Sequence, residues 1–159
     1  MTDWIEYKLV SGETGKISCV DSDLKELSWY FLKGYAHRKE PRPSKKTIYM
    51  HRLIMERMLQ RKLLSTEHVD HINGNILDNC RTNLRLATHV ENIRNQKRRV
   101  NNTSGYKGVY KPKRRNRWIA RICVNNKGIH IGSFSTPEEA YKAYCEKAKQ
   151  IFGEFFRPE

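Results

Sequence analysis

Two adjacent side chains near the middle of the chain, Asp70 and His71, have the chemistry needed to cleave a phosphodiester bond. Such hydrolysis needs an activated water and neutralisation of charge on the phosphate and the leaving oxygen. An imidazole that is neutral near pH 7 can take a proton from water. A carboxylate is a hard ligand that suits Mg²⁺ or Mn²⁺. His71 is therefore a candidate general base, and Asp70 a candidate metal ligand.

Two asparagines follow this pair at short intervals. Asn83 lies 12 residues after His71, and Asn92 lies 9 residues further on. The amide oxygen of Asn92 is a hard donor, which makes it a candidate second metal ligand beside Asp70, better suited to magnesium or manganese than to zinc. A lone Asp-His pair is usually part of a surface loop. The nearby turn, Asn73-Gly74-Asn75, and the asparagines favour a site instead.

The elements that would position these residues are a strand, a polar loop and a helix. Asp70 and His71 precede the loop that runs to Asn83, a short strand is expected at residues 84–86, and Thr88 with Glu91 forms a capping box that starts a helix. Upstream, short β-like runs at 4–10, 16–20 and 47–50, with a helical turn at 21–27, predict a small irregular sheet. Residues 51–59 have apolar residues at helical spacing, namely Leu53, Ile54, Met58 and Leu59.

The composition indicates a nucleic-acid partner. The 159 residues include 31 Lys and Arg against 17 Asp and Glu, a formal net charge of +14, and the mean hydropathy is −0.80. An anionic membrane surface fits less well, because no apolar run approaches the roughly 20 residues that span a bilayer. We also expect no signal peptide. The four cysteines lie far apart, so we expect no structural zinc site and favour a reducing cytoplasm.

A second module is predicted after residue 99. From 92 to 137 there is no acidic residue, while twelve residues are Lys or Arg. Strands are expected at 106–110, 117–124 and 129–134. A helix then begins at Thr136-Pro137-Glu138-Glu139, with a cap, a first-position proline and a capping-box glutamate, and ends at Gly153. One face of this sheet would pack on the helix and the other would present a basic surface of a width that can enter a major groove.

The candidate DNA-binding residues lie on that outward face, on the basic stretch before it and at one position of the first module. They are Arg85, Lys97, Arg98, Arg99, Lys107, Tyr110, Lys111, Lys113, Arg114, Arg115, Arg117, Arg121 and His130. A run of basic residues is commonly just a solvated face. The absence of any acidic residue over 46 positions favours DNA contact here, although many such contacts would position the protein on phosphates without specifying bases.

The first module resembles the HNH endonuclease family, in particular its homing-endonuclease branch. The motifs that carry the resemblance are Met50-His51-Arg52-Leu53-Ile54, Val69-Asp70-His71-Ile72-Asn73-Gly74-Asn75, Asn83-Leu84-Arg85 and Ala87-Thr88-His89-Val90-Glu91-Asn92. The resemblance implies a ββα-metal fold in which Asp70 and Asn92 hold one divalent ion, Mg²⁺ before Mn²⁺. It also implies that His71 is the general base and that Asn83 braces the loop and orients His71. The family often has His at position 92, so the amide implies moderate magnesium affinity.

The second module resembles the Apetala-two DNA-binding domain over residues 104–156. The motifs are Ser104-Gly105-Tyr106-Lys107-Gly108-Val109, Trp118-Ile119-Ala120-Arg121-Ile122, Ile131-Gly132-Ser133-Phe134, and Glu138-Glu139-Ala140-Tyr141 with Ala143-Tyr144. The resemblance implies a sheet that contacts base edges and phosphates. Tyr110, Cys123 and His130 stand where plant members have some arginines and a tryptophan, so the target sequence does not carry over.

Together these observations predict an α+β protein: a small N-terminal sheet with an HNH nuclease domain at 1–99 (ββα-metal core about 66–99), a linker at 100–105, and at 106–159 a three-stranded antiparallel sheet packed on one helix. The predicted function is site-directed hydrolysis of double-stranded DNA by a monomer or weak dimer. By resemblance it acts in the cytoplasm of a bacterial or phage-infected cell.

Two alternative functions compete with this prediction. One is a sequence-specific DNA-binding regulator with an inactive HNH unit. The other is an RNA-binding or RNA-cleaving protein, which is disfavoured because no aromatic pair stands on the outward sheet face.

Three residues near the predicted site each have two possible interpretations. His51 is expected to be a packing or helix-start residue in preference to a ligand. His89 lies one helical turn before Asn92, so it either supports a metal ligand or faces solvent. Arg85 either binds the scissile phosphate or is a solvated arginine.

Overall fold

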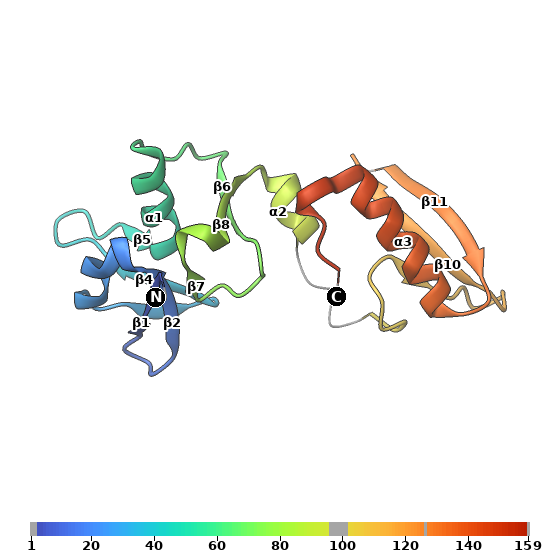
Figure 1. Cartoon of the computed structure of the whole chain (residues 1–159), viewed down its shortest axis with the longest axis horizontal. Coiled ribbons are helices and arrows are strands. Elements are labelled where there is room, and N and C mark those ends of the chain that lie inside the picture. Colours follow the sequence, from blue (N-terminus) through green and yellow to red (C-terminus); the bar gives the residue numbers. More distant parts are fainter. Residues whose placement is uncertain (1–2, 96–101, 126, 159) are drawn as a thin grey trace. The chain divides into compact units, whose positions relative to one another are not determined.

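The protein is an α+β chain that divides into two compact units, Met1–Asn92 and Ile93–Glu159. The computed structural model describes residues 3–95, 102–125 and 127–158 (Figure 1). No helix among these residues is long and apolar enough to cross a membrane. The predicted linker at 100–105 begins outside the described residues, and its boundaries stay a prediction.

The N-terminal unit contains two small three-stranded sheets, where the sequence predicted a single irregular one. In the first, β1 (Trp4–Lys8) pairs antiparallel with β2 (Thr14–Ser18), which pairs in parallel with the short β7 (Asp78–Asn79). The second sheet has the order β3 (Tyr30–Leu32), β4 (Tyr35–Lys39) and β5 (Thr47–Tyr49). The parallel pairing of β7 brings the loop after His71 against the N-terminal sheet.

Helix α1 (Met50–Leu59) packs on the core of this unit. Met50, Ile54 and Met55 face the core, together with Ile17, Leu24 and Trp29. The predicted apolar stripe is partly wrong, because Met58 and Leu59 are each 38% exposed. The helix ends at Gln60, whose left-handed backbone allows its N–H to bond back to the last turn.

The predicted strand, loop and helix around Asp70 are present (Figure 1). Strand β6 (His68–His71) pairs antiparallel with β8 (Leu84–Ala87), and α2 (His89–Asn95) follows directly. The capping box is confirmed: the Thr88 N–H donates to the Glu91 carboxylate at 2.8 Å, and the Glu91 N–H donates to Thr88 Oγ1 at 3.3 Å. Between the strands lie β7 and a 3₁₀ turn, η2 (Arg81–Asn83).

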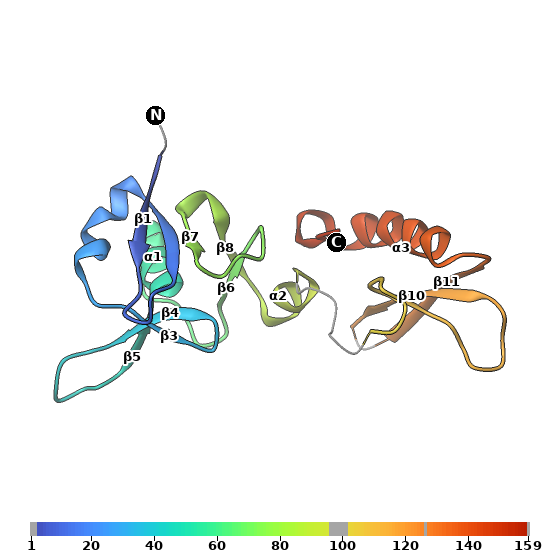
Figure 2. The same cartoon turned by 90° about the horizontal axis from the view of Figure 1, so that it is seen from below.

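The C-terminal unit is an antiparallel sheet covered on one face by a helix, as Figure 2 shows. The sheet order is β11 (Lys127–Phe134), β10 (Trp118–Val124) and β9 (Val109–Tyr110), and the helix is α3 (Pro137–Phe152). The Thr136–Glu139 capping box, the proline in the first turn and Gly153 at the C-cap are all confirmed. Ala120 and Ile122 are buried beneath α3, whereas Arg121 and Cys123 face outward, so the two faces alternate from residue 120 to 123. The alternation does not extend to Ile119, which is also buried.

A buried ion-pair cluster ties the N-terminal unit together. Asp21 lies in the 3₁₀ helix η1 (Cys19–Glu26), and its carboxylate is fully buried. It accepts from Arg81 at 2.7 and 2.9 Å and from Arg57 at 3.3 Å. Because Arg57 lies in the last turn of α1 and Arg81 begins η2, this one carboxylate joins three segments, including the one that carries Asn83.

Replacing Asp21 by alanine is expected to lower the free energy of unfolding by about 3 kcal/mol, because breaking a buried ion pair leaves its partners uncompensated. Asp23→Ala is the matched control: Asp23 also pairs with Arg57, at 2.7 Å, but its side chain is 61% exposed. That change should cost less than about 1 kcal/mol. Urea unfolding of both variants measures the difference, and equal losses would contradict a special role for the buried carboxylate.

Candidate functional site

The carboxylate of Asp70 is held from across the strand pair by Arg85. The two residues are direct partners in the register of β6 and β8. Arg85 Nε donates to Asp70 Oδ2 at 2.8 Å, and Nη2 lies 2.7 Å from the same oxygen. The side chains are 5% and 13% exposed, so a freely solvated Arg85 is wrong. The guanidinium stabilises the negative form of a carboxylate that is otherwise costly to bury.

His71 is held by a residue that the sequence did not single out. Its Nε2 lies 3.1 Å from Oδ1 of Asn79, which is on β7, and both side chains are buried. Asn79 Nδ2 in turn donates to the hydroxyl of Tyr7 on β1, at 2.8 Å. The only sequence signal for Asn79 was its place in the polar loop. No spacing rule identifies the contact of Asn79 with Tyr7, because it spans 72 positions.

The hydrogen bonds define which nitrogen of His71 can act as a base. Because the amide nitrogen of Asn79 faces Tyr7, its oxygen faces His71, and a carbonyl oxygen accepts only. Nε2 therefore carries the hydrogen, and Nδ1 is the basic nitrogen. Burial lowers the pKa of His71, although the bond to Asn79 and the charges of Asp70 and Asp78 oppose this. The imidazole is thus neutral at pH 7, as a general base must be.

Asn83 braces the loop that follows the pair. Its Oδ1 accepts from the backbone N–H of Asn73 at 2.9 Å, its Nδ2 donates to the carbonyl of Asp78 at 2.7 Å, and its own carbonyl accepts from the N–H of Ile72. These three bonds span both ends of the loop. The bracing role fits the prediction, while the hydrogen bond that fixes the His71 ring comes from Asn79.

His51 packs beside the catalytic candidate, as its packing interpretation predicted. It is 9% exposed, and its ring centroid lies 5.4 Å from that of His71 and 4.9 Å from that of Tyr35. Burial, followed by the nearby His71 and Arg52, lowers the pKa of His51 to about 3. His51 therefore stays neutral and adds no positive charge next to His71.

This buried imidazole makes stability depend on pH. The pKa of His51 is about 3 in the folded chain and about 6.5 when exposed, so the unfolded chain binds one more proton between these values. The contribution of His51 to the free energy of unfolding is fully present above pH 6.5. It is lost as the pH drops through this window, by at most about 1.4 kcal/mol per pH unit. Urea unfolding of the wild type and His51→Gln from pH 7 to 4 should give a shallower slope for the variant. The exposed His130→Gln serves as the control, and parallel slopes for wild type and His51→Gln would contradict the assignment.

The second predicted metal ligand, Asn92, is half-buried on α2, where its N–H bonds to the carbonyl of Thr88. His89 is exposed, and its ring contacts His68 at 5.1 Å. No group of three or more His, Cys, Asp and Glu side chains is placed to hold a metal in the described part of the chain. Asp70 and Asn92 each carry a hard oxygen donor, the kind that suits an ion that keeps several waters, such as Mg²⁺.

The predicted DNA-binding residues of the C-terminal unit lie mostly on its exposed surface. Tyr110, Lys111, Lys113, Arg114, Arg115, Arg117, Arg121 and His130 are exposed, and Lys107 is half-buried. Arg121 and His130 are cross-strand partners on the outward face, beside a hollow of about 600 Å³ lined by Tyr110 and Cys123. A side chain at Gly128 would meet the Arg121 guanidinium, so glycine there lets Arg121 lie across the sheet. Lys97, Arg98 and Arg99 lie outside the described residues.

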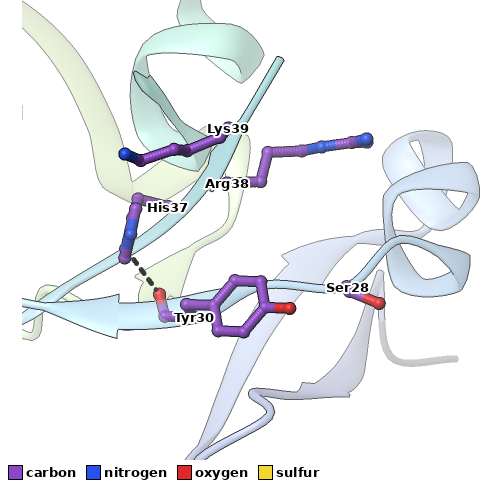
Figure 3. Close-up of a pocket in the computed structure, with 5 residues that line it drawn as sticks. All are labelled: Ser28, Tyr30, His37, Arg38 and Lys39. Atoms are coloured by element: carbon purple, nitrogen blue, oxygen red, sulfur yellow. Dashed lines mark hydrogen bonds between the residues drawn. The ribbon is translucent and has the colours of Figure 1, made fainter. Parts of the chain in front are cut away.

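A second basic hollow, of about 520 Å³, lies on the β3–β4 sheet of the N-terminal unit (Figure 3). It is lined by Ser28, Tyr30, His37, Arg38 and Lys39. The His37 ring bonds to the backbone carbonyl of Tyr30 at 2.9 Å, which orients the His37 side chain. The lining has no acidic residue, and its cationic groups could bind a phosphate. No sequence pattern predicted this surface.

Comparison with known proteins assigns each unit to a family. Residues 48–94 match the family model of HNH endonucleases, and residues 104–154 match that of the AP2 domain. The chain is 36% identical over 109 residues to a protein of Acanthamoeba polyphaga mimivirus named as an HNH endonuclease, covering 69% of this chain and 56% of that protein. It is 34% identical over 90 residues to protein 3.8 of Escherichia phage T7, covering 57% of this chain and 74% of that protein. No solved structure matches the chain.

These matches define an HNH domain followed by an AP2 domain. The chain belongs to the HNH endonuclease family, and it carries the AP2 domain C-terminal to the HNH domain. It spans little more than half of the mimivirus relative, at 56% of that protein's length.

Proposed function

We propose that the protein is a site-directed DNA endonuclease, similar in action to homing endonucleases, that hydrolyses phosphodiester bonds with one divalent metal ion. The observation that carries the proposal is the buried pair at the end of β6, where His71 is neutral and presents Nδ1 as its basic nitrogen next to a charged Asp70. Membership of the HNH family supports the same reaction class.

In this mechanism each protein group has one task. Nδ1 of His71 accepts a proton from the attacking water while the oxygen of that water bonds to phosphorus. The ester P–O bond breaks, and the leaving oxygen takes a proton from solvent. The charges of Asp70 and Asp78 favour the imidazolium that forms. Asp70 and Asn92 would hold the ion, Mg²⁺ before Mn²⁺. When bound, it would supply neutralisation of the phosphate and of the leaving oxygen.

The AP2 unit would select where the cut is made. Its exposed basic face, centred on Arg121 and His130, supports binding to double-stranded DNA by phosphate contacts and base contacts together. One nuclease centre per chain suits a monomer that nicks one strand or a weak dimer that cuts both. We place this activity in the cytoplasm of a bacterial or phage-infected cell.

Mapping the cleaved ends in a pool of duplexes of random sequence tests this function. The full chain with Mg²⁺ should produce ends that cluster at one fixed distance from a common sequence, and Arg121→Ala should scatter or reduce them. Absence of Mg²⁺-dependent ends, with DNA binding retained, would overturn the endonuclease proposal and favour a DNA-binding regulator.

A further inference from the structure

The buried hydrogen bonds behind His71 form a continuous connection to the N-terminal sheet. They run from His71 Nε2 to Asn79 Oδ1, from Asn79 Nδ2 to the Tyr7 hydroxyl, and from that hydroxyl to the carbonyl of Leu77 at 3.3 Å. Asn79 and Tyr7 are each 1% exposed. Asn79 lies within the range that matches the HNH family model but outside the motifs quoted above, and Tyr7 precedes that range.

The direction of every bond in this connection is determined by its last member. A backbone carbonyl accepts only, and that of Leu77 also accepts from the Lys16 N–H at 2.9 Å. The Tyr7 hydroxyl must therefore donate to Leu77, so its oxygen accepts from the Asn79 amide nitrogen. That leaves the Asn79 amide oxygen facing His71. Burial raises the pKa of Tyr7, which keeps this hydroxyl protonated.

The local backbone leaves room for this arrangement. Gly15 is the direct cross-strand partner of Tyr7 in the β1–β2 pair. A Cβ at this position would lie 2.5 Å from the Tyr7 hydroxyl and 2.4 Å from the Leu77 carbonyl oxygen. Any other residue would therefore displace both members of the connection. Gly15 directly precedes the point where β7 joins the sheet, since Lys16 and Ile17 are the β2 partners of Asp78 and Asn79.

We propose that Tyr7 and Asn79 are positioning residues that hold His71 in the tautomer with hydrogen on Nε2, so that Nδ1 faces the reaction as the base. This assignment rests on the proposed nuclease function. It gives the N-terminal sheet a task in catalysis: β1 and β2 fix the Tyr7 hydroxyl, which fixes the Asn79 amide, which fixes the imidazole. A buried network with every donor and acceptor paired is rigid, because any flipped member leaves a polar group unpaired.

Nitrogen NMR of the histidine rings tests the proposal without relying on cleavage. In the ¹⁵N-labelled full chain above pH 7, Nε2 of His71 should give the signal of a protonated nitrogen and Nδ1 that of an unprotonated one. Asn79→Asp keeps an acceptor oxygen and should retain this pattern. Asn79→Leu and Tyr7→Phe should shift His71 toward a mixture of both tautomers. Tyr35→Phe is the control, because it keeps the ring beside His51 and His71 and changes only a hydroxyl outside the connection.

Cleavage of plasmid DNA is then measured on the same proteins. We expect the cleavage rate to fall about 100-fold for Asn79→Leu. For Tyr7→Phe we expect a fall of about tenfold, because the carbonyl of Leu77 still accepts from the Asn79 amide. DNA affinity should be unchanged in both variants, and Asn79→Asp should restore activity. Wild-type tautomer ratios in both Asn79→Leu and Tyr7→Phe, or shifted ratios with undiminished cleavage, would overturn the proposal. A wild type that holds the Nε2–H tautomer but never cleaves would contradict the nuclease function and leave the structural connection supported. Tyr7→Phe keeps the test decisive if Asn79→Leu does not fold.

Discussion

Replacing His71 by alanine is expected to lower the rate of DNA cleavage by about 10²- to 10⁴-fold, the usual contribution of a positioned general base. Burial lowers the pKa of this imidazole, and Asn79 orients it at 3.1 Å, so the substitution removes the proposed basic nitrogen. Gel analysis of supercoiled plasmid over time measures the rate. DNA affinity should stay within about twofold, because the removed ring is only 4% exposed.

His68→Ala is the matched control for that experiment. His68 lies on the same strand, three residues before His71, and its ring contacts His89 instead of the site. This variant should cleave at close to the wild-type rate. A loss of cleavage as large as that of His71→Ala would show that any disturbance of β6 abolishes activity, and a His71→Ala protein with full activity would contradict its role as the base.

Replacing Asp70 by asparagine is expected to reduce cleavage by about 100-fold or more and to weaken Mn²⁺ or Mg²⁺ binding, because the proposed charged ligand of the ion is lost. The same change leaves the buried Arg85 guanidinium without its counter-charge, so a fall in stability is also expected. Asparagine keeps an oxygen that can accept from Arg85, and Asp70→Ala should therefore be the less stable of the two variants. Isothermal titration with Mn²⁺ and urea unfolding measure the two effects separately.

Asp23→Asn provides the comparison, since it removes one carboxylate of the same unit from an exposed position. It should leave both Mn²⁺ affinity and cleavage unchanged. If Asp70→Asn bound Mn²⁺ as tightly as the wild type, Asp70 would be a structural partner of Arg85 and not a ligand. The ion-pair geometry alone, at 2.7 and 2.8 Å, accommodates a structural role, so the metal titration decides between them.

Local patterns in the sequence predicted the elements that depend on neighbouring residues. Thr88 with Glu91 and Thr136 with Glu139 marked both helix starts, because a capping box is made within four residues. Alternation along β10 identified the face that packs on α3. Strands β3 and β4 were missed. For β3 the reason is that all three of its residues are exposed and leave no alternating pattern.

The parts of the site that the sequence did not predict are contacts between distant segments. Asn79 reaches Tyr7 across 72 positions, and Asp21 reaches Arg81 across 60. Such polar contacts have no period, and they depend on a two-residue parallel pairing, β2 with β7, that no local propensity specifies. The sequence could therefore identify Asp70 and His71 as the reactive pair, but not the Asn79 and Tyr7 side chains that orient His71.

The most direct test of the central claim is relaxation of supercoiled plasmid by the full chain, measured first in chelator and then after Mg²⁺ is restored. Wild type and His71→Ala are run together. The buried Asp70–His71 pair predicts that the wild type relaxes the plasmid only once Mg²⁺ is present, while His71→Ala stays inactive with the metal and still binds the DNA. Relaxation by the wild type in chelator, or by His71→Ala at the wild-type rate, would contradict a metal-dependent nuclease centre at this pair.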